Sequence, residues 1–321
     1  DGGFIIDKAY FNKHWSYIKT RDLIYQSSIS LLFKNLKLLN KQILSYEKSK
    51  VYFNPLYRSP NLYYTIKYIL KFYKKLLEKF VKKYLTKFFG VKFDNWTLFI
   101  GKGKFLNSSL FRLKPVKVPR NEFWADPFIF NYKNKNYVFF ENFSYKTKKG
   151  KISCGLINDY DIVDVKDSLT LDYHLSYPFI FQEEKKIYMI PETYQNKRLE
   201  IFVCKKFPNE WELYSTAFEG DLIVDTSFFR DNNNNKWLFL NKSRNKDIPF
   251  DNELYIYKID SLKLNSIIPH ELNPIQIDSR LARNAGPIFE YDNSFYRPSQ
   301  ANVENIYGRY LNINKITELS I

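Results

Sequence analysis

Acidic side chains stand inside apolar runs of this sequence, and the clearest is Asp126 in "FWADPFIF". A lone buried carboxylate is costly. Carboxyls that are brought together repel one another, and their pKa values move apart until one donates protons and another serves as base or nucleophile. That arrangement acts on glycosidic bonds. Such an arrangement can form here only if the chain repeats this pattern and the fold brings the acids of the repeats together.

The candidate residues occupy two equivalent positions of a pattern that occurs four times. The first position holds Asp126, Tyr177, Asp225 and Gly286. The second position, four residues after an aromatic one, holds Glu141, Glu192, Asn241 and Gln300. Polar residues close to these positions are His174, Arg280, Arg283, Asn284 and Arg297.

Any of the four acids Asp126, Glu141, Glu192 and Asp225 could take part in such chemistry, and we predict that the other polar residues at and near these positions bind substrate. The arginines suit a phosphate or an acidic sugar. The alternative for each acid is a structural role, because an Asp before Pro often caps a turn.

Four segments carry the pattern: "ADPFIFNYKNKNYVFFEN", "SYPFIFQEEKKIYMIPET", "VDTSFFRDNNNNKWLFLNK" and "AGPIFEYDNSFYRPSQ". Each predicts a strand, a tight turn and a second strand. A third strand is predicted after the first three segments, in "KISCGLI", "LEIFVCKKF" and "ELYIYKI", and a fourth in "WELYSTAF". Four antiparallel strands in a unit of about 50 residues are typical of a β-propeller blade.

We therefore predict a mainly β fold: a five-bladed β-propeller with four clear blades and a fifth that is split between the ends or incomplete, after an N-terminal α-helical segment. "NWTLFI" is expected to help close the ring. The first strand of each blade lines the propeller axis and the second runs beside it. Both sets of candidate positions should therefore face one mouth of the central channel.

Residues 1–92 precede the predicted propeller of residues 93–321. Residues 1–52 are predicted to have mixed, mostly helical structure. Residues 53–92 are predicted to form a linker with a basic amphipathic helix. Within residues 61–90, apolar residues recur at steps of three and four among eight lysines and one acid, and Gly90 is expected to end the helix. Two interpretations stay open: the apolar face docks on its own domain, or the helix lies on an anionic membrane surface.

The formal net charge of +16 fits either a lysine-rich surface or an anionic partner. The absence of zinc-finger spacing and RNP-type motifs argues against nucleic acid. No Walker loop, GxGxxG or GxSxG occurs, and the three histidines are too scattered for a zinc site. No metal and no cofactor are therefore predicted.

Two cysteines in strand-like runs favour free thiols in a reducing compartment. We find no apolar run long enough to span a membrane and no signal peptide. We expect a cytoplasmic protein, with peripheral attachment to the inner face of the membrane as the alternative. Because the chain does not begin with Met, we expect it to be a piece of a longer polypeptide.

Several motifs in order resemble one family, among them "FWADPFIF", "HLSYPFIF", "VDTSFF", "SRLARNAGPIF" and "YRPSQ". The family is the propeller domain at the N-terminal side of plant glucosamine inositolphosphorylceramide transferases, which also occurs in bacterial proteins of surface-polysaccharide clusters. The resemblance covers about residues 95–318. The domain is similar to the five-bladed propellers of the family 43 and family 32 glycoside hydrolases.

The resemblance implies roles for the acids. In those hydrolases an Asp of the first inner strand is the base or nucleophile, which Asp126 in "ADP" matches. Glu192 and Asp225 are the nearest matches to the proton donor and the helper acid, although their blade order differs. Residues 1–52 resemble the tail of a formyltransferase-like domain, which we expect upstream in the parent polypeptide. The catalytic Asn-His-Asp set of that domain is not in this chain, so formyl transfer is not assigned to it.

The sequence thus predicts a carbohydrate-active propeller in cell-surface glycan or glycolipid biosynthesis, with a sugar or glycolipid as substrate. Two alternatives stay open: a non-catalytic glycan-binding or scaffolding propeller, and a glycoside hydrolase. If the chain is catalytic, we expect glycosyltransferase-associated or glycosidase-like chemistry. The residues alone do not decide whether it is an enzyme.

Overall fold

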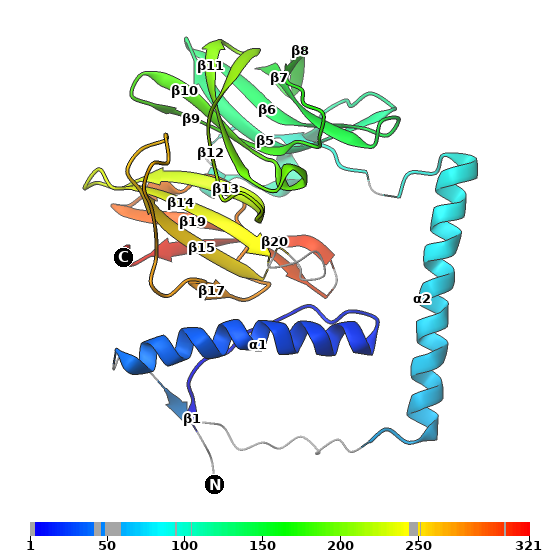
Figure 1. Ribbon diagram of the computed structural model, residues 1–321. Coiled ribbons are helices and arrows are strands. Elements are labelled where there is room, and N and C mark those ends of the chain that lie inside the picture. The colour runs from blue at the N-terminus through cyan, green and yellow to red at the C-terminus, as the bar shows by residue number, and fades with distance from the viewer. Residues whose placement is uncertain are drawn as a thin grey trace.

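The computed structural model describes residues 4–41, 46–48, 59–93, 95–103, 105–243, 250, 252–304 and 306–321. Most of its strands form four antiparallel sheets that follow one another along the chain, and we call them blades 1 to 4 (Figure 1). The first strands of blades 1 to 3 each pack against the next blade. The predicted mainly β propeller is therefore confirmed for four blades.

Blade 1 consists of β5 (Glu122–Tyr132), β6 (Lys135–Ser144), β7 (Lys149–Asn158) and β8 (Asp161–Leu169). Blade 2 consists of β9 (Ser176–Glu183), β10 (Lys186–Glu192), β11 (Leu199–Lys206) and β12 (Glu210–Ala217). Blade 3 consists of β13 (Leu222–Arg230), β14 (Lys236–Ser243) and β15 (Glu253–Ile259), with β16 (Ile267–Pro269) and β17 (Gln276–Ile277) both against β15. Blade 4 consists of β18 (Phe289–Tyr291), β19 (Ser294–Val303) and β20 (Ile306–Ile316). The predicted third strands and "WELYSTAF" are confirmed, whereas β20 was not expected.

Tight turns join the first two strands of three blades, and both central residues have the positive φ of a type I′ hairpin turn, which Asn and Asp tolerate well. The central residues have φ between 47° and 65° in the pairs Lys133–Asn134, Glu184–Lys185 and Asp292–Asn293. Beyond the turns, aromatic rings fill the spaces between blades. Centroid distances are 4.9 Å for Phe128–Tyr177, 4.6 Å for Phe181–Phe228 and 4.9 Å for Phe229–Phe295.

The segment before blade 1 lies between blades 1 and 4. It contains β3 (Phe99–Ile100), β4 (Lys114–Pro115) and the 3-10 turns η1 (Phe105–Asn107) and η2 (Leu110–Arg112). Leu98 packs into the blade 1 core, and the Trp96 ring meets the Tyr307 ring of blade 4 at 6.1 Å. The "NWTLFI" strand therefore pairs with β4 rather than with a blade. Within the described ranges no further sheet forms a fifth blade.

The N-terminal part contains β1 (Phe4–Ile5), α1 (Tyr17–Asn40), β2 (Glu47–Lys48) and α2 (Leu62–Phe89), while η3 (Tyr194–Asn196) belongs to a blade 2 loop. The segment before α1 is bonded to the propeller, since the Tyr10 carbonyl accepts the Ser279 N–H at 2.9 Å. Helix α2 stands apart from the blades (Figure 1). Asn61 caps its start, and Gly90 ends it with φ of 63°, as predicted. Among the helices that the structure describes, none is both long enough and apolar enough to cross a membrane.

Candidate functional site

The first candidate position of each repeat lies in a backbone kink. Its φ is 50° at Asp126, 43° at Tyr177, 47° at Asp225 and 139° at Gly286. In blades 1 to 3 the ladder between the first two strands shifts register here, so that two residues oppose one. Such a bulge re-aims a side chain, and bulges are frequent beside functional sites. Asp126 and Asp225 therefore lie inside their strands, not at the strand starts that the sequence predicted.

Acids from three blades meet around one arginine, Arg283. Its Nε donates to Asp225 Oδ2 at 2.5 Å, and its Nη2 lies 3.7 Å from Glu192 Oε2. Asp126 lies close enough to Asp225 for their charges to interact, and its Oδ2 accepts the Tyr177 N–H at 3.2 Å. The side chains of Glu192, Asp225 and Arg283 are only 6 % to 11 % exposed, so solvent screens these charges poorly. The predicted convergence of the three catalytic candidates is therefore present.

The environment separates the pKa values of these acids. Burial raises the pKa of Asp126 to about 6, helped by the charge of Asp225 and opposed by the Tyr177 N–H and Arg283. Burial raises the pKa of Glu192 well above its usual range, and both the charge of Asp225 and a hydrogen bond to that carboxyl add to this. Asp126 is therefore mostly ionised at neutral pH, whereas the upward shift of the Glu192 pKa favours its protonated form, and acid–base chemistry needs such a pair.

A second pair of polar groups, Glu141 and His174, lies beside Asp126. His174 Nδ1 accepts the Gly150 N–H at 2.9 Å, so the ring proton is on Nε2, which lies 3.5 Å from Glu141 Oε1. Gly150 permits this approach, because a Cβ there would lie within 3 Å of the Leu175 carbonyl and of both side chains. Burial and the charge of Asp126 raise the pKa of Glu141 to about 8, and burial lowers the pKa of His174.

The raised pKa of Glu141 predicts a pH-dependent stability. The folded protein binds this proton more tightly than the unfolded chain, so stability falls as pH rises from about 4.5 to about 8. We expect Glu141→Gln to remove roughly 2–4 kcal/mol of that fall. Urea unfolding at pH 5 and pH 8 measures it. Glu290→Gln, at an exposed site, is the control and should keep the wild-type slope; an unchanged slope in Glu141→Gln would contradict the assignment.

Three other predicted binding residues hold the segment that carries Arg283. The Asn241 amide donates to the Glu253 and Ala282 carbonyls, both at 2.9 Å, and its oxygen accepts the Asn284 N–H. Asn284 Nδ2 donates to the Asp225 carbonyl at 2.8 Å, and its oxygen accepts from Arg297 at 3.0 Å. All three side chains are buried. Their observed contacts position Arg283, and direct contact with a ligand stays a prediction.

Tyr177 connects three blades rather than facing the cleft. Its hydroxyl lies 3.0 Å from Ser227 Oγ and accepts the Gly286 N–H at 3.0 Å, and the ring is buried. We expect Tyr177→Phe to lower the free energy of unfolding by about 1–3 kcal/mol, because the buried Gly286 N–H loses its acceptor. Equilibrium urea unfolding tests this. Tyr291→Phe, whose ring is exposed, should change it by less than about 0.5 kcal/mol; equal effects in both variants would refute the bridging role.

Arg280 lies away from the mouth. Its guanidinium donates to both oxygens of Asp278, and its Cζ lies 3.4 Å from the centre of the Tyr10 ring. The structure thus places Arg280 where the N-terminal segment joins the propeller. Of the two predicted arginines before blade 4, only Arg283 faces the acids.

A cleft of about 410 Å³ opens beside the acids. Five predicted residues line it: Asp126, Glu141, Glu192, Arg283 and Gln300. Gln300 Nε2 is buried and makes no hydrogen bond of regular geometry within the described part of the chain, although the Gln300 side chain lies within hydrogen-bonding reach of the Tyr307 hydroxyl. Sequence reasoning missed the aromatic walls, which are Trp96, Phe99, Phe123, Trp124 and Tyr307. Rigid aromatic walls with a few convergent polar groups are typical of small-molecule sites.

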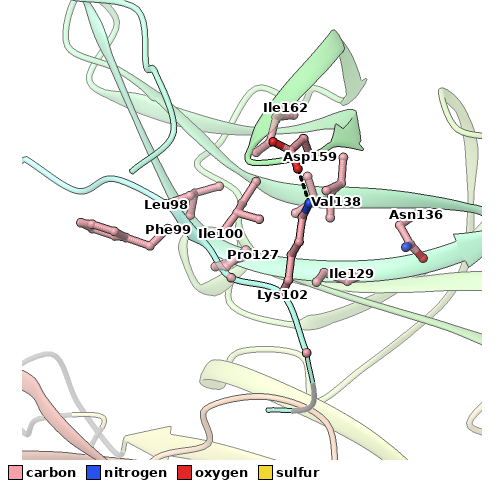
Figure 2. A pocket seen from close by; sticks show the side chains of 13 residues that line it. Leu98, Phe99, Ile100, Lys102, Pro127, Ile129, Asn136, Val138, Asp159 and Ile162 are labelled. Carbon is pink, nitrogen blue, oxygen red and sulfur yellow. Dashed lines mark ion pairs between the residues drawn. The ribbon is translucent and has the colours of Figure 1, made fainter. Parts of the chain in front are cut away.

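A larger hollow of about 650 Å³ adjoins the cleft and shares Leu98, Phe99 and Pro127 with it. Figure 2 shows its apolar side chains and the ion pair between Lys102 and Asp159 at one side. None of the predicted site residues lines this hollow. The hollow is thus a mostly apolar extension beside the cleft, formed by blade 1 and the segment before it, and it carries none of the candidate polar groups.

Fold and site together define a β-propeller in which acids of three blades and one arginine meet at one mouth of the central channel. The chain belongs to the family described as glucosamine inositolphosphorylceramide transferase 1, N-terminal, whose profile matches residues 112–321. This confirms the resemblance on which the roles of the acids depended. The likeness of residues 1–52 to a formyltransferase-like domain stays a prediction.

Curated relatives agree with the family. Glucosamine inositolphosphorylceramide transferase 1 of Oryza sativa subsp. japonica is 34 % identical over 204 residues, which are 62 % of this chain and 27 % of the relative. The protein of the same name from Arabidopsis thaliana is 32 % identical over 207 residues, which are 63 % of this chain and 26 % of the relative. The chain thus spans about a quarter of the length of these relatives.

Among solved structures, the exo-β-1,3-galactanase of Phanerochaete chrysosporium is similar to the chain with a TM-score of 0.46 and 13 % identity. The match covers 70 % of this chain and 61 % of the galactanase. A likeness of this degree says nothing about the chemistry of the site.

Proposed function

We propose that this chain is the carbohydrate-active propeller of a glycosyl-transfer system that acts on a glycolipid, with the sugar bound in the channel-mouth cleft. One observation carries the proposal: Asp126 and Glu192 line a cleft with aromatic walls together with Arg283, and Asp225 of a third blade pairs with that arginine. Carboxyls with separated pKa values suit chemistry on a sugar, and flat apolar surfaces can pack against its ring. An arginine suits a charged group, such as a phosphate, that is attached to the sugar.

The geometry gives each group a distinct part in a reaction at a glycosidic carbon. Ionised Asp126 serves as base toward an attacking hydroxyl, or as the nucleophile itself. Protonated Glu192 gives its proton to the oxygen of the leaving group as the bond to carbon breaks. Asp225 keeps that proton on Glu192, and Arg283 balances the charge that remains. The Gln300 amide, which lies beside the Tyr307 hydroxyl, can donate to a sugar hydroxyl or a phosphate oxygen.

The substrate classes to test first follow from the relatives. The rice and Arabidopsis proteins are named glucosamine inositolphosphorylceramide transferase 1. A glucosamine-containing sugar and inositolphosphorylceramide therefore lead the panel, with other sugar nucleotides and furanosides as further members.

The second candidate is a non-catalytic glycan-binding propeller. The short ion pair between Arg283 and Asp225 favours it, because such a pair also serves to fix the shape of a binding site. The full chain separates the two candidates if binding is followed by saturation-transfer NMR and turnover by mass spectrometry. Wild type is compared with Glu192→Gln and with Asp159→Asn, whose carboxyl lies outside the cleft.

Our proposal predicts that wild type and Asp159→Asn bind and turn over one member of the panel, while Glu192→Gln binds it without turnover. Binding without turnover in all three proteins would favour the glycan-binding module. Full turnover in Glu192→Gln would contradict the assigned proton donor.

A further inference from the structure

We propose that α2 attaches this protein to an anionic membrane surface, lying in the plane of the headgroups. The helix is amphipathic along its whole length. The apolar stripe is formed by Leu62, Ile66, Ile69, Tyr73, Leu77, Phe80, Tyr84 and Phe88. We call these eight residues the α2 stripe.

The α2 stripe is open to solvent. None of the residues of α2, all of which the structure describes, is buried, and the stripe residues are 43 % to 76 % exposed. The other interpretation of the sequence, docking of this face on its own domain, is therefore not what the structure shows. An exposed apolar surface of this length marks an interaction site.

The contacts that α2 makes with the rest of the chain use a different side of the helix. The Tyr68 hydroxyl accepts the Tyr17 N–H at 3.0 Å, the Phe72 ring lies 4.9 Å from that of Trp15, and Lys79 lies over Trp15. At 3.6 residues per turn these three α2 residues lie roughly 105–150° around the helix from the centre of the stripe. The helix can therefore keep its contact with the N-terminal segment while the stripe is engaged elsewhere.

Charge indicates what covers the stripe. Helix α2 carries eight lysines and one acid, Glu78, which is paired with Lys75 at 2.6 Å. Six of these lysines lie on the side away from the stripe, and Lys83 and Lys87 flank it. When the stripe is inserted, the flanking lysines can place their ammonium groups at the headgroups, and the other six lie about one helix diameter away, still within reach of the attraction of anionic lipid. A neutral protein groove would not use this excess of positive charge.

Helix length agrees with a position on the surface. Its 28 residues reach about 42 Å, which exceeds the hydrocarbon core of a bilayer, but a lysine on almost every turn prevents crossing. This attachment would hold the channel-mouth cleft near lipid-borne sugars, yet it depends on α2 alone and not on the proposed reaction.

Flotation of the full chain with vesicles tests the attachment. We expect the wild type to float with phosphatidylcholine vesicles that contain 30 % phosphatidylglycerol, and to bind pure phosphatidylcholine at least tenfold more weakly. High salt should reduce the binding. The stripe variant Tyr73→Gln with Phe80→Gln should lose at least tenfold. Tyr64→Gln with Phe89→Gln removes the same two residue types from the lysine side and should lose less than threefold.

A second pair of variants tests the charge. Lys83→Gln with Lys87→Gln, which flank the stripe, should weaken binding roughly tenfold or more, whereas Lys135→Gln with Lys186→Gln, at hairpins of blades 1 and 2, should not. Circular dichroism confirms the helix in each variant. Asp126→Asn should float like wild type, which separates this inference from the sugar chemistry.

Three results would overturn the inference. Equal binding to neutral and anionic vesicles would remove the role of charge. Equal losses in the two aromatic double variants would remove the role of the stripe. A stripe variant that floats normally but changes the mass measured by light scattering would assign the stripe to contact between protein chains instead.

Discussion

Replacing Asp126 with Asn is expected to lower turnover of the substrate about 10²–10⁴-fold and to leave the fold intact. The amide cannot take a proton from an attacking hydroxyl and cannot attack carbon. It can still accept the Tyr177 N–H that now binds Asp126 Oδ2. Because burial and Asp225 raise the pKa of Asp126 to about 6, a neutral side chain should be as stable there as the acid or more so.

Two measurements check this prediction. Turnover compares Asp126→Asn with wild type, and urea unfolding compares their stabilities. Turnover of the wild type should also fall below pH 6, as Asp126 becomes protonated. If Asp126→Asn kept full turnover, Asp126 would be neither base nor nucleophile. A large loss of stability with the loss of turnover would instead make Asp126 a structural residue.

Replacing Arg283 with Ala is expected to destabilise the protein by about 3–5 kcal/mol at pH 8 and to abolish ligand binding. Arg283 is the positive partner of both Asp225 and Glu192, and solvent reaches little of any of the three side chains. Its loss leaves the buried carboxyls to repel one another. The destabilisation should be smaller at pH 5, because the pKa values of Glu192 and Asp126 rise further and protonation relieves the repulsion.

Arg230→Ala is the matched control. Arg230 also pairs with a buried acid, Glu183, at 3.4 Å, but half of its side chain is exposed, so its loss should cost less than about 1 kcal/mol. Adding Asp225→Asn to Arg283→Ala should recover part of the lost stability, since it removes one unpaired charge. Urea unfolding of the wild type and these three variants at both pH values measures the effects. Similar small effects for Arg283 and Arg230 would show that the cluster does not depend on this arginine.

The repeat was the most informative feature of the sequence. The alternation of "ADPFIF" and its three counterparts, with polar pairs at the turns, predicts hairpins, and the regular intervals predict blades. Because equivalent residues of a propeller face the same way, aligning the repeats was enough to bring together Asp126, Glu192 and Asp225. The family resemblance added roles for these acids, which stay predictions.

The remaining features of the site depend on backbone and packing that composition does not reveal. The bulges give Asp126 and Tyr177 positive φ values, although neither position carries a glycine. Trp96 belongs to a segment outside the repeat, so no alignment of repeats could place it in the cleft. Arg280 and Arg283 are three residues apart and of one type, and only the observed contacts show that one faces the acids and the other Tyr10.

The most direct test of the central claim is a crystal structure of Glu192→Gln with the sugar ligand found by the NMR screen. We predict electron density for a sugar ring in the channel-mouth cleft, with its reacting carbon next to Asp126 and its polar groups on Arg283 and Gln300. Density confined to another surface, such as the apolar hollow of blade 1, would contradict the claim that these acids form the carbohydrate site.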